Sequence, residues 1–308
     1  MPKDGMRTFA VEVERQPGVL LKFSESSFPK ARRGSIFVGA GDSYSAAMAG
    51  FYGSNGSCIA VDPYHLASAP DIAKGADVYL ISVSGRTASN LAVVKRVRRL
   101  ARRTVAITSD EKSTLARLVD EVVRLPMRYV PRKPGFLSYS LSLLAVMNIA
   151  GLRERCDFES AFCEARGDEG NIQWENGTTY FLGNSLAYVA AIYAAAKTYE
   201  FFGAKAHPQL LEEFSHMELF SLAPSDVVNC FAAFDPSGAS GRLAKALARE
   251  GYESHTVPSR GGTYTERLFH LIFAGQLSVL RRAGELSLSK PNFLTAARRL
   301  AVSDSMIY

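Results

Sequence analysis

The sequence contains one pattern twice: a short apolar strand, a turn that contains glycine, and a helix rich in small residues. The first copy is GSIFVGAGDSYSAAMAG at residues 34–50, and the second is TTYFLGNSLAYVAAIYAAAK at residues 178–197. Within these copies, Phe37-Val38-Gly39 corresponds to Phe181-Leu182-Gly183. Strands that alternate with helices are joined to parallel neighbours by right-handed crossovers, so the repeat predicts two parallel sheets covered by helices.

Each half of the chain continues with further strand patterns. Candidate strands occur at residues 77–85 and 103–109 in the first half, and at residues 226–238 and 252–259 in the second. This alternation predicts an α/β protein with two tandem doubly wound, flavodoxin-like domains. We place the domains at residues 29–152 and 173–283, a linker at 153–172, a helical N-terminal arm at 1–28 and a helical C-terminal tail at 284–308.

Composition narrows the class of protein. The 308 residues are 47% hydrophobic and 21% charged, which is typical of a globular protein with room for two domains. No apolar stretch is long enough to span a bilayer, and the charged N-terminus has no signal-peptide core, so we expect a cytoplasmic protein without a membrane partner.

The cysteines and the charged residues indicate neither a metal site nor a nucleic-acid-binding protein. The four cysteines show no C-x-x-C spacing, so we expect buried, reduced thiols rather than a metal site or disulfides. The net charge is +6, and the densest basic run, residues 95–103, shares its predicted helix with an apolar stripe. Such a run is typical of a solvated helix face, and no nucleic-acid motif accompanies it.

Two strand-to-helix turns in the first half are candidates for binding an anion. They are residues 39–44 (GAGDSY) and residues 82–87 (SVSGRT). Glycines let the main chain approach an anion, helix N-termini offer free N–H groups, and hydroxyls add donors. The alternative interpretation is that these hydroxyls only cap helices. Because the sequence has neither G-x-x-x-x-G-K-[ST] nor G-x-G-x-x-G, the turns favour a monophosphate ester such as a sugar phosphate, with no cofactor.

These residues resemble the sugar isomerase (SIS) domain family. SVSGRT resembles the S-x-S-G-x-T signature, GAGDSY resembles the first phosphate loop, and EVERQP at residues 12–17 is similar to the segment that leads into the isomerase half of glucosamine-6-phosphate synthases. The resemblance covers nearly the whole chain as two tandem SIS domains. It implies that the phosphate is bound by Gly41, Ser43, Ser82, Val83, Ser84, Gly85 and Thr87.

An aldose–ketose isomerisation through an enediol needs a base near C1 and C2 and a group that opens the sugar ring. Lys197 and Glu200 are three residues apart on a predicted helix and are surrounded by apolar residues. The alternative interpretation is an ordinary ion pair on the surface of a helix. His216 alone is most simply an ordinary histidine. The resemblance implies that Glu200 is the enolisation base, that His216 opens the ring and that Lys197 assists. It also implies a homodimer with shared active sites, because the family's histidine reaches into the partner's site.

The sequence departs from the family at several positions. Asp42 and Arg86 replace the usual threonine and glutamate, and Arg86 is placed to reinforce anion binding. The family's C-terminal lysine is replaced by Ala296 or Ala297, next to Arg298, which stays charged and cannot form a Schiff base. Arg132 is a further candidate, because the dual phosphoglucose/phosphomannose isomerases carry an arginine in a similar loop.

These residues predict a phosphosugar isomerase that acts on a hexose 6-phosphate or an amino-hexose 6-phosphate. We also expect no glutaminase activity, because the chain begins Met1-Pro2-Lys3 and its first cysteine is Cys58. Two alternatives stay open at this point. One is a deaminase or deglycase of an amino-sugar phosphate, and the other is a non-catalytic protein that binds a sugar phosphate.

Overall fold

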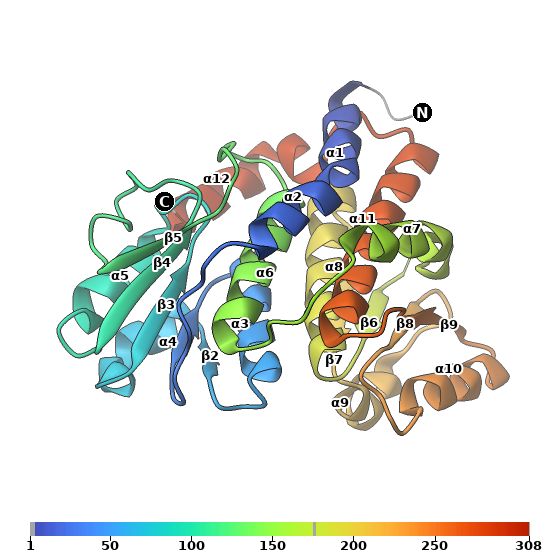
Figure 1. Cartoon of the computed structure of the whole chain (residues 1–308). Coiled ribbons are helices and arrows are strands. Elements are labelled where there is room, and N and C mark those ends of the chain that lie inside the picture. The colour runs from blue at the N-terminus through green and yellow to red at the C-terminus, as the bar shows by residue number, and fades with distance from the viewer. Residues whose placement is uncertain (1–3, 175–176, 308) are drawn as a thin grey trace. The chain divides into compact units, whose positions relative to one another are not determined.

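The computed structural model describes residues 4–174 and 177–307. Parts of the predicted arm (1–3), second domain (175–176) and tail (308) lie outside the described residues. The chain forms two compact units that are discontinuous in sequence. The first-sheet unit comprises Val19–Arg153 and Ala297–Tyr308, and the second-sheet unit comprises Met1–Gly18 and Glu154–Ala296 (Figure 1). The predicted domain boundaries stay a prediction.

The first-sheet unit is built on five parallel strands in the order β2-β1-β3-β4-β5. This is the flavodoxin-like order, in which the connections leave in opposite directions on either side of the boundary between β1 and β3. The strands are β1 (Ile36–Val38), β2 (Ile59–Val61), β3 (Asp77–Ile81), β4 (Arg103–Thr108) and β5 (Glu121–Arg124). The helices are α2 (Gln16–Ser24), which begins in the other unit, α3 (Asp42–Gly53), α4 (Pro63–Ser68), η1 (Pro70–Ala73), α5 (Ala88–Val97), α6 (Leu137–Ala150) and α12 (Ala297–Ile307).

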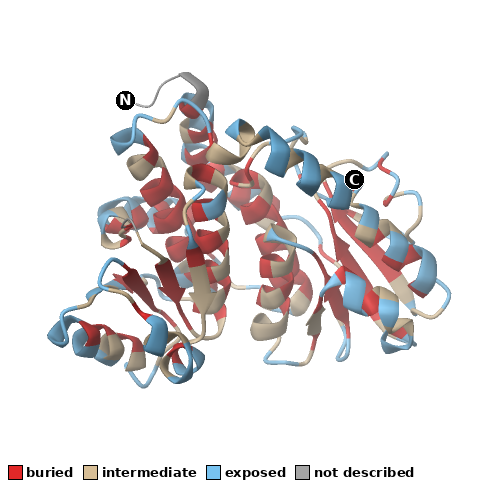
Figure 2. Ribbon diagram, turned by 180° about the vertical axis from the view of Figure 1, so that it is seen from behind, coloured by how far each residue is buried: buried red, intermediate tan, exposed pale blue. Residues whose placement is uncertain are grey.

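Alternate side chains of the first sheet enter two different cores. One face packs Val78 and Leu80 against Leu66 of α4 and Val93 of α5. On the other face, Phe37 stacks on Tyr79 with ring centroids 5.0 Å apart, and α3 approaches so closely that a Cβ on Gly50 would overlap the Phe37 ring. Both faces are therefore buried (Figure 2), as expected for a parallel sheet.

The second-sheet unit repeats the plan with four parallel strands in the order β7-β6-β8-β9. One face packs Leu182 and Val228 against Phe214 and Leu247. The strands are β6 (Thr179–Leu182), β7 (Ala206–Gln209), β8 (Val227–Ala232) and β9 (Glu253–Pro258). The helices are α1 (Asp4–Glu14), α7 (Phe158–Asp168), η2 (Glu169–Asn171), α8 (Leu186–Phe202), α9 (Leu211–His216), η3 (Glu218–Ser221), α10 (Ala239–Arg249), α11 (Tyr264–Glu285) and η4 (Asn292–Thr295). The predicted class of two parallel-sheet α/β domains is confirmed.

The structure can be compared with two predictions made from composition, the absence of a membrane-spanning helix and the burial of the cysteines. Among the described residues, no helix has the length and apolar character needed to cross a membrane. The prediction that all four cysteines are buried is wrong for Cys163, which is exposed on α7, whereas Cys58, Cys156 and Cys230 are buried. Cys163 falls on the solvent side of an amphipathic helix whose other face holds Phe158 and Phe162.

Candidate anion site and candidate catalytic residues

The turn after β1 brings the main chain close to the start of α3. A Cβ on Gly39 would overlap the backbone of Ser43, so the turn needs a glycine there. Gly41 precedes the helix with a φ of 57°, a conformation that glycine adopts without steric cost. Ser43 lies in the first turn of α3, half-buried, and its hydroxyl makes no hydrogen bond to the rest of the described chain. Its hydroxyl is therefore available to a ligand.

The turn after β3 is held by its own hydroxyl groups. Ser82 is buried, its hydroxyl lies 2.9 Å from that of Thr87, and it accepts a hydrogen bond of 3.1 Å from the N–H of Gly85. The hydroxyl of Ser84 accepts a hydrogen bond of 3.2 Å from the N–H of Arg86. These contacts close the turn into a compact loop at the carboxyl end of β3.

Backbone contacts fix the orientation of this loop. The carbonyl of Val83 accepts hydrogen bonds from the N–H of Ser109 at 3.1 Å, the hydroxyl of Ser109 at 2.9 Å and the hydroxyl of Thr108 at 3.1 Å. Gly85 has a φ of 61°, and a Cβ there would overlap the side chain of Ser113. The turn after β3 is thus anchored to the turn after β4.

Helix capping does not explain the hydroxyl groups of this turn. Thr87 is the N-cap residue of α5, yet its side chain makes no capping hydrogen bond and lies next to Ser82 instead. By contrast, Asp62 caps α4 and Thr263 caps α11 with a full capping box. The interpretation of Thr87 as a helix cap is therefore wrong, and the first-turn N–H groups of α5 lack a side-chain acceptor from their N-cap residue.

The two turns belong together because their strands are neighbours. Val38 of β1 pairs with Leu80 of β3, so both turns leave the same edge of the sheet, on either side of the point where the strand order reverses. Ligands of open parallel sheets bind at this point. The starts of α3 and α5 add the partial positive charge of two helix N-termini. We call the two turns, residues 39–44 and 82–87, the cradle.

The charged residues near the cradle have partners of their own. The carboxylate of Asp42 lies against Gly135, where a Cβ would overlap it. Arg86 is exposed and its guanidinium reaches Asp110 at 3.5 Å. Arg132 has a φ of 56° and pairs with Asp304 of α12 at 2.7 Å. Arg298, also on α12, is exposed. Sequence reasoning did not identify Asp110 and Asp304, because they lie far along the chain from their partners.

Lys197 and Glu200 form an ion pair on α8, in the second-sheet unit. The ammonium of Lys197 lies 2.5 Å from Oε2 of Glu200 and 5.1 Å from the centre of the Tyr193 ring. The side chain of Lys197 is fully buried, whereas that of Glu200 is 32% exposed. The side chain of Glu200 is therefore partly accessible from solvent and lies next to a buried cation. The alternative interpretation of an ordinary surface ion pair does not hold, because the Lys197 side chain is buried.

A buried hydrogen-bond chain supports this pair. Nε2 of Gln16 donates to Oε1 of Gln276 at 2.6 Å, and Nε2 of Gln276 donates to the hydroxyl of Tyr193 at 3.0 Å. Gln16 and Gln276 are completely buried and Tyr193 is almost so. A satisfied polar chain of this kind fixes side-chain orientation, and here it orients the ring that lies beside Lys197. No local pattern predicts this series of hydrogen bonds, since its residues come from three separate helices.

His216 lies apart from this buried chain. It is the last residue of α9, its side chain is 72% exposed, and its Nε2 lies 3.1 Å from a carboxylate oxygen of Glu212. Exposure of this degree leaves the imidazole open to solvent or to another molecule.

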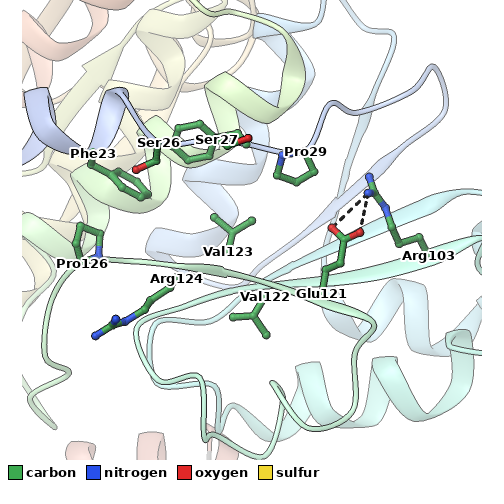
Figure 3. Close-up of a pocket in the computed structure, with 11 residues that line it drawn as sticks. Phe23, Ser26, Ser27, Pro29, Arg103, Glu121, Val122, Val123, Arg124 and Pro126 are labelled. Atoms are coloured by element: carbon green, nitrogen blue, oxygen red, sulfur yellow. Dashed lines mark hydrogen bonds and ion pairs between the residues drawn. The ribbon is translucent and has the colours of Figure 1, made fainter.

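The described residues also contain a cleft of about 810 Å³ that includes none of the predicted site residues (Figure 3). It lies between the segment that holds Phe23 and Pro29 and the edge strand β5, and an ion pair of 3.1 Å joins Arg103 to Glu121 at one end. Among the described residues, no group of three or more His, Cys, Asp or Glu side chains is arranged to hold a metal ion.

Comparisons with known proteins agree with this fold. Residues 30–150 match the family model of the SIS domain. No curated protein sequence matches the chain. Glucosamine-6-phosphate deaminase from Thermotoga maritima is a similar solved structure, with a TM-score of 0.71, 20% identity, and coverage of 90% of this chain and 94% of that one.

Two other solved structures are similar over most of their length. Tagatose-6-phosphate ketose/aldose isomerase from Escherichia coli has a TM-score of 0.73 at 17% identity, covering 93% of this chain and 96% of that one. The C-terminal domain of glucosamine-fructose-6-phosphate aminotransferase from Francisella tularensis has a TM-score of 0.68 at 14% identity, covering 91% and 95%. Because the sequence identities are 20% or lower, these comparisons show a similar fold and no more.

Proposed function

Because residues 30–150 of this chain match the family model of the SIS domain, we propose that the protein is a phosphosugar isomerase that interconverts an aldose and a ketose phosphate. The observation that carries the proposal is the cradle: two anchored turns at the switch point of a parallel sheet, with hydroxyl groups that do not cap helices. Among the similar structures, the ketose/aldose isomerase supports this proposal, whereas the glucosamine-6-phosphate deaminase supports the alternative of a deaminase.

In this proposal the cradle binds the phosphate group of the sugar. The hydroxyl of Ser43 donates to a phosphate oxygen, and so does one hydroxyl of the hydrogen-bonded pair Ser82 and Thr87, whose other member donates within the pair. The N–H groups at the start of α3 and α5 add to the attraction. Gly41, Val83, Ser84 and Gly85 contribute through the main chain and the shape of the turn. The carbonyl of Val83 does not oppose the anion, since it already accepts three hydrogen bonds from the turn after β4.

Glu200 is the proposed base of the enolisation. It takes the proton from C2 of the aldose, the electrons of that bond form the C1–C2 double bond, and the carbonyl oxygen at C1 takes up a proton to give the enediol. The same carboxyl then returns its proton to C1, while the hydroxyl at C2 gives up its proton and becomes the ketose carbonyl. The ammonium of Lys197 lies 2.5 Å from Oε2 of Glu200 and holds the carboxylate in position. His216 is the proposed acid and base that opens the ring, by moving a proton between the hydroxyl and the ring oxygen.

The test is to incubate the protein separately with fructose 6-phosphate, glucose 6-phosphate and glucosamine 6-phosphate. We expect interconversion of an aldose and a ketose, with Glu200→Gln lowering kcat by about 100-fold or more. Ser82→Ala should mainly raise KM. Ammonia release from glucosamine 6-phosphate would instead show a deaminase that uses the same base. Binding without turnover of any of the three would refute the isomerase and leave a sugar-phosphate-binding protein.

A further inference from the structure

A basic groove lies next to the cradle, at the carboxyl ends of the strands of the first sheet. Its volume is about 510 Å³, and its lining includes Arg86, Asp110, Arg124, Arg128 and Tyr129. Arg86 follows β3, Asp110 follows β4, and Arg124 ends β5, so three neighbouring parallel strands deliver these side chains to one place. We call this the arginine groove.

The arginine groove carries more positive than negative charge. Three guanidinium groups line it, against the single carboxylate of Asp110. The contacts that engage them are long: Arg86 reaches Asp110 at 3.5 Å and Arg124 reaches Glu111 at 3.5 Å. Arg128 is exposed and makes no hydrogen bond or ion pair within the described chain. Guanidinium groups bind carboxylates and phosphates in a forked geometry, so the groove is suited to an anionic group.

The groove and the cradle are joined through two residues. The N–H of Arg86 binds Ser84 of the cradle, while the guanidinium of Arg86 lines the groove. Ser109, which also lines the groove, binds the carbonyl of Val83 in the cradle. A ligand whose phosphate occupies the cradle therefore has the arginine groove as its neighbour along the sheet edge.

We propose that the arginine groove binds a second anionic group, a phosphate or a carboxylate, carried by the same sugar phosphate that the cradle holds. This inference rests on the proposed function and narrows it, because it assigns the substrate to sugars with two acidic groups. Asp110 holds the guanidinium of Arg86 over the groove, and Arg128 supplies a guanidinium that no other described side chain engages.

The test compares the binding of fructose 6-phosphate with that of fructose 1,6-bisphosphate in calorimetric titrations of the whole protein. The bisphosphate serves as an unreactive probe of the two anion sites, because its esterified C1 oxygen cannot become a carbonyl. We expect the bisphosphate to bind at least tenfold more tightly than the monophosphate, and Arg128→Gln to lower that preference by about tenfold, the effect of losing one charge-assisted hydrogen bond. Arg99→Gln is the matched control, because Arg99 is an exposed arginine on the same unit with no partner among the described residues.

Equal affinity for the two ligands, or equal losses in Arg128→Gln and Arg99→Gln, would overturn the inference. A second titration uses inorganic pyrophosphate and the double variant Ser82→Ala/Ser43→Ala, whose cradle lacks two donors. Pyrophosphate should still bind this variant, and adding Arg128→Gln should weaken that binding by about tenfold or more. If pyrophosphate binds but the bisphosphate is not preferred, the groove takes a separate anion and the substrate class is wrong. Failure of monophosphate binding would instead refute the proposed function.

Discussion

At the scale of single residues, two glycines decide whether the cradle can form. Gly39 allows α3 to approach the end of β1, and Gly85 combines a φ of 61° with a close approach to Ser113. A side chain at Gly85 would meet both penalties, a strained backbone and an overlap. Gly75 has a similar φ of 73°, but an added Cβ there would meet no atom within 4 Å. A substitution at Gly75 therefore measures the cost of backbone strain without the cost of an overlap.

We predict that Gly85→Ala lowers the free energy of unfolding by about 3 kcal/mol, because strain and overlap add. Gly75→Ala should cost only about 1 kcal/mol, the strain alone. Denaturant titrations of both variants measure the difference. Ser113→Gly in the Gly85→Ala background should recover the part due to overlap. Equal losses in Gly85→Ala and Gly75→Ala would show that the contact with Ser113 has no energetic effect.

Sequence reasoning found the residues of the cradle because they lie in two short runs at strand ends. It did not find what those residues contact. The partner of Arg86 is Asp110 and that of Arg132 is Asp304, and neither pairing has a local signature. The same limit applies to the chain from Gln16 through Gln276 to Tyr193, whose partners come from separate helices.

At the scale of elements, the sequence predicted the inner strands β1, β3, β4, β6 and β8 and one edge strand, β9. The strands it did not predict, β2, β5 and β7, are all at sheet edges. An edge strand packs less apolar surface, and these three have largely half-buried or exposed residues, so the apolar signal is weak. β7 also contains Pro208, which argues against a strand in sequence but is tolerated at an edge.

The contact between α8 and α11 gives a prediction about Lys197. Tyr193→Leu removes the ring beside the ammonium and should lower kcat/KM by about tenfold, because a desolvated cation–π contact is worth about 1–2 kcal/mol. Tyr193→Phe keeps the ring, so its activity should stay within about twofold, while the lost hydrogen bond from Gln276 costs about 1 kcal/mol of stability. Steady-state kinetics with denaturant titrations separate the two. Equal activity losses would rule out a role of the ring.

The contact between α7 and α11 gives a prediction about pH. His270 is fully buried and its Nε2 lies 3.1 Å from Asp168, which Arg260 also binds. Burial lowers the pKa of His270 below the usual 6.5 although Asp168 opposes this, with Glu164 and Arg260 as the other nearby charges. The hydrogen bond from Arg260 lowers the pKa of Asp168 below its usual 3.8, with His270 contributing.

Because the pKa values of His270 and Asp168 are lowered in the folded chain, each group binds a proton more readily in the unfolded chain. A fall in pH therefore favours unfolding. We predict that the second-sheet unit loses stability as the pH falls below about 6.5, by up to about 1.4 kcal/mol per pH unit while His270 alone titrates. Trp174, the one tryptophan of the sequence, is buried in this unit, so its fluorescence in urea reports the loss. His270→Gln should flatten the dependence between pH 7 and 5, and an unchanged slope would contradict this.

At the scale of the whole molecule, the candidate residues are divided between the units. The cradle belongs to the first-sheet unit, whereas Lys197, Glu200 and His216 belong to the second. The exposed His216 is the residue that the proposed homodimer would exchange between subunits. Mixing two inactive variants tests whether it does.

We predict that Glu200→Gln and His216→Ala chains are each impaired alone and recover about a quarter of wild-type activity when mixed after dissociation. Half of the random dimers are mixed, and one of the two sites in each contains both intact residues. Activity is measured after refolding the variants together. Mixing two batches of the same variant is the control. No recovery, in chains that sedimentation shows to be dimers, would mean that each subunit uses its own histidine.

The cradle itself is tested most directly by a crystal structure of the protein with fructose 6-phosphate. We predict that the phosphate lies between the two turns, within hydrogen-bonding distance of the hydroxyls of Ser43, Ser82 and Thr87. Ser82→Ala crystals treated in the same way should show reduced occupancy. A phosphate bound away from residues 39–44 and 82–87, or full occupancy in Ser82→Ala, would contradict the assignment of the cradle.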